Sequence, residues 1–254
     1  ALEAALADPE LQRRLAELSG SKSEAEAAEM RRLQELGTAR KAHVTLVVSP
    51  VEVELFRKEA PDVRVALVSN IHQVHGRSKS WGEREDILFI GSFEHPPNVD
   101  AMHHFIDDVF PLLAAQRPAI RLRIVGPCAP KSLVAKAGPN IEFLGFVEDI
   151  APLFHNVRLS IAPLRYGAGV KGKINSSMSY GVPVIASPIA AEGMGLEHEV
   201  DVLIADTPQA FANAIVRAYD DEQLWQRLSD AAVANLERHF SFAVATRQLR
   251  EILD

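Results

Sequence analysis

A glycine-rich segment that carries three positive charges is the feature of this sequence best suited to chemistry. Within nine residues it brings together three cationic side chains and three glycines, namely Arg165, Lys171, Lys173, Gly167, Gly169 and Gly172. Glycines let backbone N–H groups approach a ligand closely, and a helix predicted to begin near Lys173 would direct its positive end at the loop. Charge-assisted hydrogen bonds to phosphate contribute roughly 1.5–3 kcal/mol each, against about 0.3–1 kcal/mol for the helix end. The segment therefore predicts an anion site in which the cations contribute most of the binding free energy.

Two other interpretations of this segment stay open. One is a solvent-exposed loop whose charges bind nothing. The other is the phosphate loop of nucleoside triphosphatases, because GAGVKGKI, from Gly167 to Ile174, nearly matches G-x-x-x-x-G-K-[S/T]. Ile174 stands where that motif supplies a hydroxyl for Mg²⁺, and no hydrophobic strand ends in a suitably placed Asp. The triphosphatase is therefore disfavoured.

Apolar runs that alternate with helical patterns determine the predicted fold. The runs are ILFIG (87–91), IRLRIVG (120–126), IEFLG (141–145), VRLSIAP (157–163), VPVIAS (182–187) and DVLIAD (201–206). Between the first two, apolar residues from Val99 to Val109 recur at helical spacing until Pro111, which is expected to kink or end the helix. Three further helices are expected from Thr207 to Asp254. This alternation predicts an α/β fold with a doubly wound parallel sheet, whose ligands bind beyond the carboxyl ends of the strands.

The first 75 residues predict only part of a second lobe. The expected elements are two helices within 1–42 (the second from about Ser23 to Arg40), strands at 44–49 and 63–69, and a helix from Pro50 to Lys58. Two strands cannot make an independent parallel sheet, so residues 1–75 are expected to be the end of a larger lobe. Residues 76–86 then predict a polar hinge, and residues 87–254 the main lobe.

Composition limits the classes of partner. The 254 residues carry a formal net charge of −7, which disfavours nucleic acid because phosphate-tracking surfaces need a surplus of Lys and Arg. Cys128 is the only cysteine and no secretory leader is evident near Ala1, which predicts a cytoplasmic protein without disulfides. No stretch approaches the roughly 20 apolar residues needed to span a bilayer, although peripheral attachment to the inner face of a membrane stays open.

The nine histidines do not predict a metal site. Adjacent His103 and His104 would project about 100° apart on a helix, so they cannot bind the same ion. Neither they nor His72 and His75 are joined by a cysteine or carboxylate pattern that would complete a site. We therefore expect no metal and no other cofactor.

The same segments resemble the retaining glycosyltransferases of family 4, also called group 1, which have the two-lobed GT-B architecture. The resemblance rests on ILFIGSFEHPPNVDAMHHF, LRIVGP, IEFLGFVEDI, APLRYGAGVKGKINSSMSYGVPVIAS and AAEGM in this order, and on VTLVVSPVEVELF and VRVALVSN before them. It implies that residues 87–254 are the C-terminal lobe, which binds a nucleoside-diphosphate sugar donor. Residues 1–75 would end the N-terminal lobe, which holds a glycan or lipid-linked acceptor. The transfer would be metal-independent, and this chain alone would bind the donor without turnover.

The resemblance also implies which residues contact each part of the donor. Those expected beneath the diphosphate are Gly91, Ser92, Arg165, Gly167, Gly169, Lys171 and Lys173. Many relatives have Arg at the position of Ser92, which shifts phosphate binding onto the three cations. The backbone of Phe146 and Val147 would contact the nucleobase, unless Phe146 is simply a core residue. The residues expected near the sugar, in a loop after a strand's carboxyl end, are Glu192, Gly193 and Met194, for which an ordinary turn is the alternative.

The family's signature of two Glu residues separated by seven positions is not intact here. Aligning on Met178 places Ser176 at the second Glu, which commonly binds the ribose hydroxyls, and residues 165–168 occupy the region of the first. No residue of this chain is an evident catalytic base. Two alternatives to an active transferase therefore stay open. One is a non-catalytic nucleotide-sugar-binding module, and the other is a nucleotide-sugar epimerase, although the glycine loop lacks the carboxylates and His that proton abstraction needs.

Overall fold

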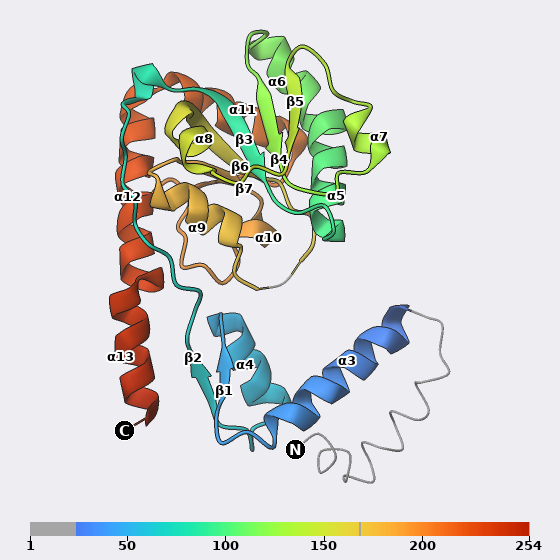
Figure 1. The fold of residues 1–254 in the computed structure, drawn as a ribbon, viewed down its shortest axis with the longest axis vertical. Helices are drawn as coiled ribbons and strands as arrows, with labels where there is room; N and C mark the ends of the chain where they lie inside the picture. The colour runs from blue at the N-terminus through green and yellow to red at the C-terminus, as the bar shows by residue number, and fades with distance from the viewer. Residues whose placement is uncertain (1–23, 168, 254) are drawn as a thin grey trace. The chain divides into compact units, whose positions relative to one another are not determined.

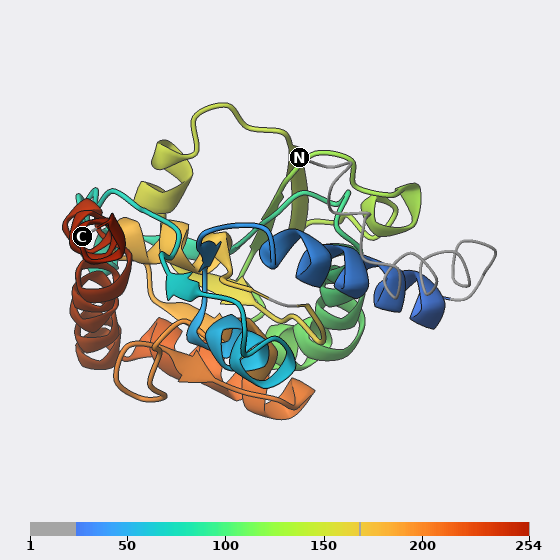
Figure 2. The ribbon, with the colours of Figure 1, turned by 90° about the horizontal axis from the view of Figure 1, so that it is seen from below.

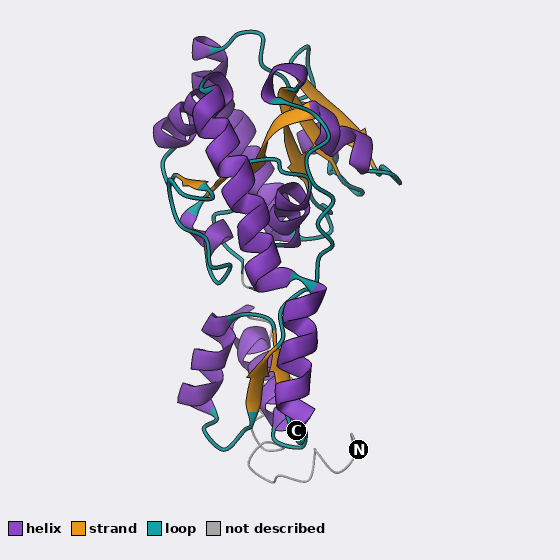
Figure 3. Cartoon of the chain, turned by 90° about the vertical axis from the view of Figure 1, so that its left-hand side faces the viewer, coloured by secondary structure: helices purple, strands orange, loops and turns teal. Residues whose placement is uncertain are grey.

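The computed structural model describes residues 24–167 and 169–253, and the chain divides into two compact units. Unit 1 is Ala1–Val68 and unit 2 is Ser69–Asp254. Each unit has its own strands and helices (Figure 3). The division falls after Val68, earlier than the boundary at residue 75 that the sequence predicted. In the part of the chain that is described, no helix combines the length and apolar character needed to cross a membrane.

Unit 1 contains a βαβ motif, as its sequence pattern predicted. Its described elements are α3 (Glu24–Ala39), β1 (Thr45–Val47), α4 (Pro50–Glu59) and β2 (Val65–Leu67). Strands β1 and β2 pair in parallel. Helix α4 begins with a capping box, in which the Ser49 hydroxyl accepts from Glu52 N and the Glu52 carboxylate accepts from Ser49 N. The second predicted helix corresponds to α3, whereas the first lies outside the described residues.

Unit 2 is built on a six-stranded parallel sheet (Figure 1). Its strands are β3 (Glu85–Ile90), β4 (Leu122–Val125), β5 (Ile141–Gly145), β6 (Val157–Ala162), β7 (Val184–Ala186) and β8 (Leu203–Ile204). Their order is β5-β4-β3-β6-β7-β8. Strands β3 and β6 therefore flank a topological switch point, where a doubly wound sheet binds its ligands. The predicted fold class is confirmed, and the last two strands are shorter than the predicted 182–187 and 201–206.

Helices cover both faces of this sheet. They are α5 (Pro96–His104), α6 (Phe110–Gln116), α7 (Lys131–Val134), α8 (Ala151–Asn156), α9 (Gly172–Ser179), α10 (Pro188–Ala191), α11 (Pro208–Asp220), α12 (Glu222–Phe240) and α13 (Phe242–Leu253). Ile87 and Phe89 of β3 pack in the cluster that α5, α6 and α11 complete, whereas Leu88 packs with Phe154 of α8. The strands separate α5 from α12 in Figures 1 and 2. The three helices predicted for the tail are α11, α12 and α13.

The helix that follows β3 changes type rather than ending at Pro111. A π-helical turn, η2 (Phe105–Val109), follows α5, and α6 continues from it with Pro111 in its first turn. Proline is tolerated at that position because the first amides of a helix have no partner within it. The sequence predicted a kink or an end at Pro111, and the structure places the irregular turn just before it.

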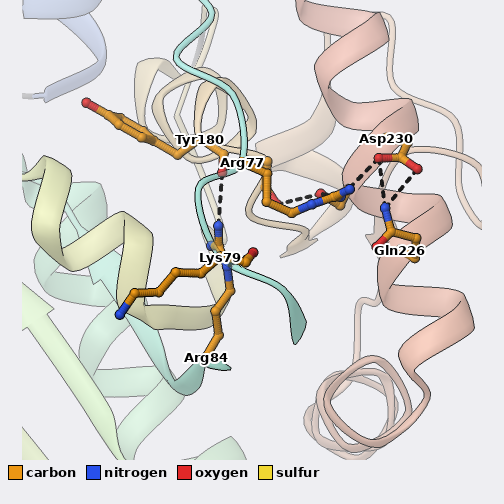
Figure 4. A network of polar contacts seen from close by, with 8 residues as sticks. Arg77, Lys79, Arg84, Tyr180, Gln226 and Asp230 are labelled. Carbon is orange, nitrogen blue, oxygen red and sulfur yellow. Dashed lines mark hydrogen bonds and ion pairs between the residues drawn. The ribbon is translucent and has the colours of Figure 1, made fainter. Parts of the chain in front are cut away.

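The segment predicted as a hinge, residues 76–86, is attached to unit 2 (Figure 4). Arg77 Nη1 donates to Ser229 Oγ at 2.8 Å and forms an ion pair with Asp230 at 3.0 Å, both on α12. Just before it, the ring of His75 stacks on Tyr180 with 4.4 Å between centroids. A short 3₁₀ turn, η1 (Trp81–Glu83), leads into β3. The segment therefore packs along unit 2 over most of its length.

Arg84 is the buried anchor of this segment, with 1% of its surface exposed. Its guanidinium donates to four backbone carbonyls, those of Lys79, Phe154, Val157 and Tyr180. It also lies over the Trp225 ring, 5.4 Å from the centroid. Burial, together with the nearby charge of Arg77, lowers the pKa of Arg84 to about 10. The Arg84 side chain thus joins residues 76–86 to α8, to β6 and to the end of α9.

Replacing this arginine should destabilise unit 2 strongly. In Arg84→Ala the four carbonyls lose their donor inside the protein, so we expect the free energy of unfolding to fall by about 3 kcal/mol. Urea unfolding followed by circular dichroism measures this. Arg227→Ala, at an exposed position of α12, is the control and should change it by less than about 0.5 kcal/mol. A loss below about 1 kcal/mol for Arg84→Ala would contradict the anchoring role.

Candidate functional site

The turn after β3 and the glycine-rich loop after β6 lie against the start of α5. Because β3 and β6 are neighbours in the sheet, the loops at their carboxyl ends lie close together. The glycine-rich loop and the start of α9 meet α5 at three points, the pairs Arg165 with Asp100, Gly167 with Pro97, and Lys173 with Asn98. These contacts bring residues that are about 65–75 positions apart in sequence into one site.

Lys173 lies in the first turn of α9; its side chain is partly exposed, and its ammonium group is largely shielded from water. Its Nζ lies 4.5 Å from the centroid of the Phe89 ring and donates to Asn98 Oδ1. In residues 24–167 and 169–253, no carboxylate forms an ion pair with it. Burial and, to a smaller extent, the charge of Lys171 together lower the pKa of Lys173 to about 7. The site is therefore a buried cation at the positive end of a helix, where an anion would be stabilised.

Asn98 is the neutral partner of this cation, and the sequence analysis did not single it out. Its side chain is 7% exposed, and its Nδ2 donates to Ser92 O at 2.6 Å. One amide thus connects Lys173 to the turn that follows β3. The signal in the sequence was a polar residue in the first turn of the helix after the first strand, at the carboxyl edge of the sheet.

The turns after β3 and β4 are packed too closely for larger residues. A Cβ atom on Gly126 would lie 1.9 Å from Gly91 O, and Gly126 also has φ of +154°. A Cβ atom on Gly91 would lie 2.8 Å from Asn98 Nδ2 and 3.0 Å from Lys173 Nζ. Gly91 therefore leaves the space in which the lysine and asparagine side chains meet.

The other two cations of the loop have different partners. Lys171 is 8% exposed and its Nζ donates to Gly169 O at 2.6 Å and to Gly167 O at 3.3 Å. Burial lowers the pKa of Lys171, while the nearby Glu192 carboxylate raises it. Lys171 thus closes the loop on itself, with its charge next to the N-cap of α9.

Arg165 forms a two-point ion pair with Asp100 of α5. Its Nε donates to Asp100 Oδ2 at 2.9 Å, and Nη2 donates to Oδ1. The arginine hydrogen bond holds the pKa of Asp100 below its ordinary value. Residues two positions apart on a helix project about 200° apart, so Arg165 and Lys173 approach α5 from different sides. The three predicted cations thus share one loop and one helix, but each has its own partner.

The residues predicted to contact the nucleoside lie on two elements. Phe146 follows β5 and is 75% exposed, so it is not a core residue. Val147 is partly buried and packs against the cluster around Leu88. Ser176 is partly buried on α9, and its carbonyl oxygen accepts from Ser179 Oγ at 2.7 Å. An exposed aromatic ring beyond a strand's carboxyl end is available to stack on a flat ligand.

The loop predicted to contact the sugar follows α10. Glu192 is exposed, and Gly193 has φ of +73°. Met194 is 1% exposed and packs in the cluster with Ile174 and Met178, so its side chain is not available to a ligand. Of this group, Glu192 is the member whose side chain can reach a bound molecule, and it lies within electrostatic reach of Lys171.

The structure also shows the surroundings of the residues that a phosphate loop or a metal site would use, two sites that the sequence disfavoured. Ile174, at the position where a phosphate loop needs a hydroxyl, is 0% exposed and packs in the core. Of the tempting histidines, His104 Nδ1 contacts Asp108 at 2.8 Å and His103 Nε2 contacts Ser132 at 3.4 Å. No group of three His, Cys, Asp or Glu side chains that could hold a metal occurs among the described residues.

Comparison with known families shows which family the chain belongs to. The family model described as glycosyl transferases group 1 matches residues 84–221, which include both loops, α5 and α9. The chain belongs to this family. The match covers more than half of the 254 residues and begins at Arg84, the buried anchor of the linker.

One sequence relative and two solved structures illustrate what this group 1 chain is similar to. A 44.6 kDa protein in the cps region of Klebsiella pneumoniae is 26% identical over 140 residues, which are 52% of this chain and 36% of the relative. TarM of S. aureus matches with a TM-score of 0.76 and 15% identity over 88% of this chain and 46% of its own. Anabaena Alr3699/HepE, solved with UDP and glucose, has a TM-score of 0.72 and 18% identity over 91% of this chain and 67% of its own. The chain thus spans less than half of the first two of these proteins and about two thirds of HepE.

The buried lysine should leave a signature in the pH dependence of stability. The folded-state pKa of about 7 lies below the ordinary 10.5, so the unfolded chain binds more protons between these values. The free energy of unfolding of the wild type should therefore rise with pH across this window, relative to Lys173→Met, by about 1.4 kcal/mol per pH unit. Below pH 7 the difference is constant and favours the methionine variant.

Urea unfolding at pH 6 to 10 measures this difference. Lys131→Met, at an exposed position of α7, is the matched control, and its difference from the wild type should stay flat. An equally flat difference for Lys173→Met would show that the ammonium group is solvated rather than buried.

Proposed function

We propose that this chain is the donor-binding half of a glycosyltransferase and that the diphosphate of a nucleoside-diphosphate sugar lies at the start of α9. The observation that carries this proposal is Lys173, a buried cation that no carboxylate of the described residues pairs with, beside the turn at Gly91. A diphosphate would supply the negative charge, and the amides of the first turn of α9 would donate to it. Lys171 adds a second charge at the N-cap, and Arg165 would contribute after leaving Asp100.

The nucleoside would lie toward β4 and β5 in this arrangement. The exposed Phe146 ring and the backbone of Val147 are suited to a nucleobase. Ser176 would offer one hydroxyl to the ribose. HepE, a structural neighbour, was solved with UDP and glucose, and this supports UDP as the first nucleotide to test. Glu192 would face the sugar.

Unit 1 would be the end of an acceptor-side lobe. The side chains of Leu46, Val51 and Leu55 are about half exposed, at 49%, 48% and 51%. A parallel sheet of two strands is too small to be stable alone and needs cover on both faces. These apolar side chains would be covered by the remainder of such a lobe, which would also bind most of a glycan or lipid-linked acceptor.

Transfer would depend on positioning and electrostatics. The bond between the anomeric carbon and the diphosphate oxygen breaks, and the lysines and helix amides stabilise the leaving diphosphate. An acceptor hydroxyl attacks the anomeric carbon and gives its proton to an oxygen of the leaving diphosphate. Retention of configuration and independence from a metal ion belong to the proposal and rest on the family resemblance. The donor lobe alone would bind nucleotide sugar without transferring it.

Removing the lysine charge should weaken nucleotide binding. In Lys173→Met one charge-assisted contact to the diphosphate is lost, so we expect the dissociation constant for UDP to rise about 10-fold or more. Calorimetric titration of this chain with UDP, GDP, ADP and dTDP measures it. Lys131→Met serves as control and should bind like the wild type. Equal affinity of Lys173→Met and wild type for every nucleotide would place the diphosphate elsewhere.

A non-catalytic nucleotide-sugar-binding module is the second candidate. It is favoured by Ser176 and by residues 165–168, which stand where the family has its two Glu residues. The full-length protein incubated with UDP-sugars separates the candidates through the appearance of free UDP. Steady release supports the enzyme, whereas binding without release supports the module.

A further inference from the structure

We propose that Asn98 is the positioning residue of the diphosphate site, because its amide holds the Lys173 ammonium beside Gly91 and couples it to the Ser92 turn. The inference rests on the proposed function, since it concerns how the same site recognises the donor. It adds a neutral residue of α5 to a site otherwise described by the glycine loop and its cations.

The orientation of the Asn98 amide is fixed by its two partners. Nδ2 donates to Ser92 O at 2.6 Å, while Oδ1 accepts from Lys173 Nζ. In the reversed orientation an N–H₂ group would face the ammonium and an oxygen would face a carbonyl, so both contacts would become repulsive. With 7% of its surface exposed, Asn98 has little access to water as a substitute. The amide therefore links the turn to the ammonium group, so that the position of one determines the position of the other.

The Lys173 ammonium has three N–H groups with distinct directions. One is used by Asn98, and the cation also faces the Phe89 ring at 4.5 Å. The space above Gly91 is closed to any side chain at that position, because its Cβ would lie 3.0 Å from Lys173 Nζ. These contacts leave the other N–H groups of the Lys173 ammonium to donate toward the turn at Gly91 and Ser92.

A neutral acceptor also determines the charge that a ligand meets. Asn98 accepts a hydrogen bond without cancelling the positive charge, whereas a carboxylate at this position would form an ion pair with it. Asp100, two residues further along α5, is already paired with Arg165. An asparagine thus keeps the ammonium in place while leaving its charge for the diphosphate.

Protonation follows from the same geometry. The charged group that acts on Lys173 is Lys171, which with burial lowers its pKa to about 7. On α5 the Asp100 charge is neutralised by Arg165, and on β3 the facing group is the uncharged Phe89 ring. A bound diphosphate favours the ammonium, so binding above pH 7 should take up a proton, and affinity should fall as pH rises.

The test compares Asn98→Asp with the wild type by calorimetric titration with UDP between pH 6 and 9. Each titration is run in buffers of different ionisation enthalpy, so that proton uptake is measured directly. For the wild type at pH 8 we expect uptake of most of one proton and a decline in affinity approaching 10-fold per pH unit. Asn98→Asp pairs with the ammonium and keeps it charged, so binding should be at least about 10-fold weaker at pH 7 and accompanied by little proton uptake.

Two further variants make the result specific. Asn213→Asp, an exposed substitution of the same chemistry on α11, should match the wild type in affinity and proton uptake. Asn98→Ala removes the acceptor without adding charge, so it should bind UDP about 10-fold more weakly. Its affinity should begin to decline at a lower pH than that of the wild type. It also serves as the test if Asn98→Asp fails to fold by circular dichroism.

The outcomes separate this inference from the proposed function. If the wild type binds none of the four nucleoside diphosphates, both fail. If the wild type binds UDP and the Asn98 variants keep its affinity and its proton uptake, the site is correct and the positioning role of Asn98 is wrong. A loss of affinity with unchanged proton uptake in both variants would indicate a merely structural role and would also overturn the inference.

Discussion

The constraint on which the rest of the structure depends is the burial of one ammonium group without an anion. Lys173 lies under the turn after β3, with an amide oxygen and an aromatic ring as its neighbours. Such a charge lowers the stability of the protein until an anion arrives. Proteins commonly keep a destabilising arrangement at a functional site, because binding there matters more than the stability that is lost.

The sheet provides the rigidity that this arrangement requires. At the switch point β3 and β6 send their loops in opposite directions, and close packing of Gly126 against Gly91 O fixes the turn after β3. The Arg84 contacts fix the other end of the same strand. A buried cation is tolerated only if its surroundings cannot relax around it or admit water, and a strand held at both ends meets that condition.

Sequence patterns were sufficient to predict the secondary-structure elements but not the partners of the charged side chains. The apolar runs predicted all six strands of unit 2, because burial on both faces of a parallel sheet leaves a strong local signal. The predicted boundaries of β7 and β8 were too long, since hydrophobicity continues past the last paired residue. The partners of Arg165 and Lys173 could not be predicted, because Asp100 and Asn98 lie 65 and 75 positions away and become neighbours only through the order of the strands. Residues 76–86, predicted as a polar hinge, are held by contacts whose partners lie 70 to 153 positions away in the sequence.

These contacts change the role of the glycine-rich loop. Its glycines and positive charges predicted that it is the anion-binding element of the chain. In the structure the loop is fastened to α5 by the ion pair of Arg165 with Asp100, and the helix that follows it is fastened at Asn98. A loop held at several points has little entropy left to lose on binding, so its amides are already positioned. Helix α5, which carries no cationic lysine or arginine of its own, therefore determines where the positive charges of the site stand.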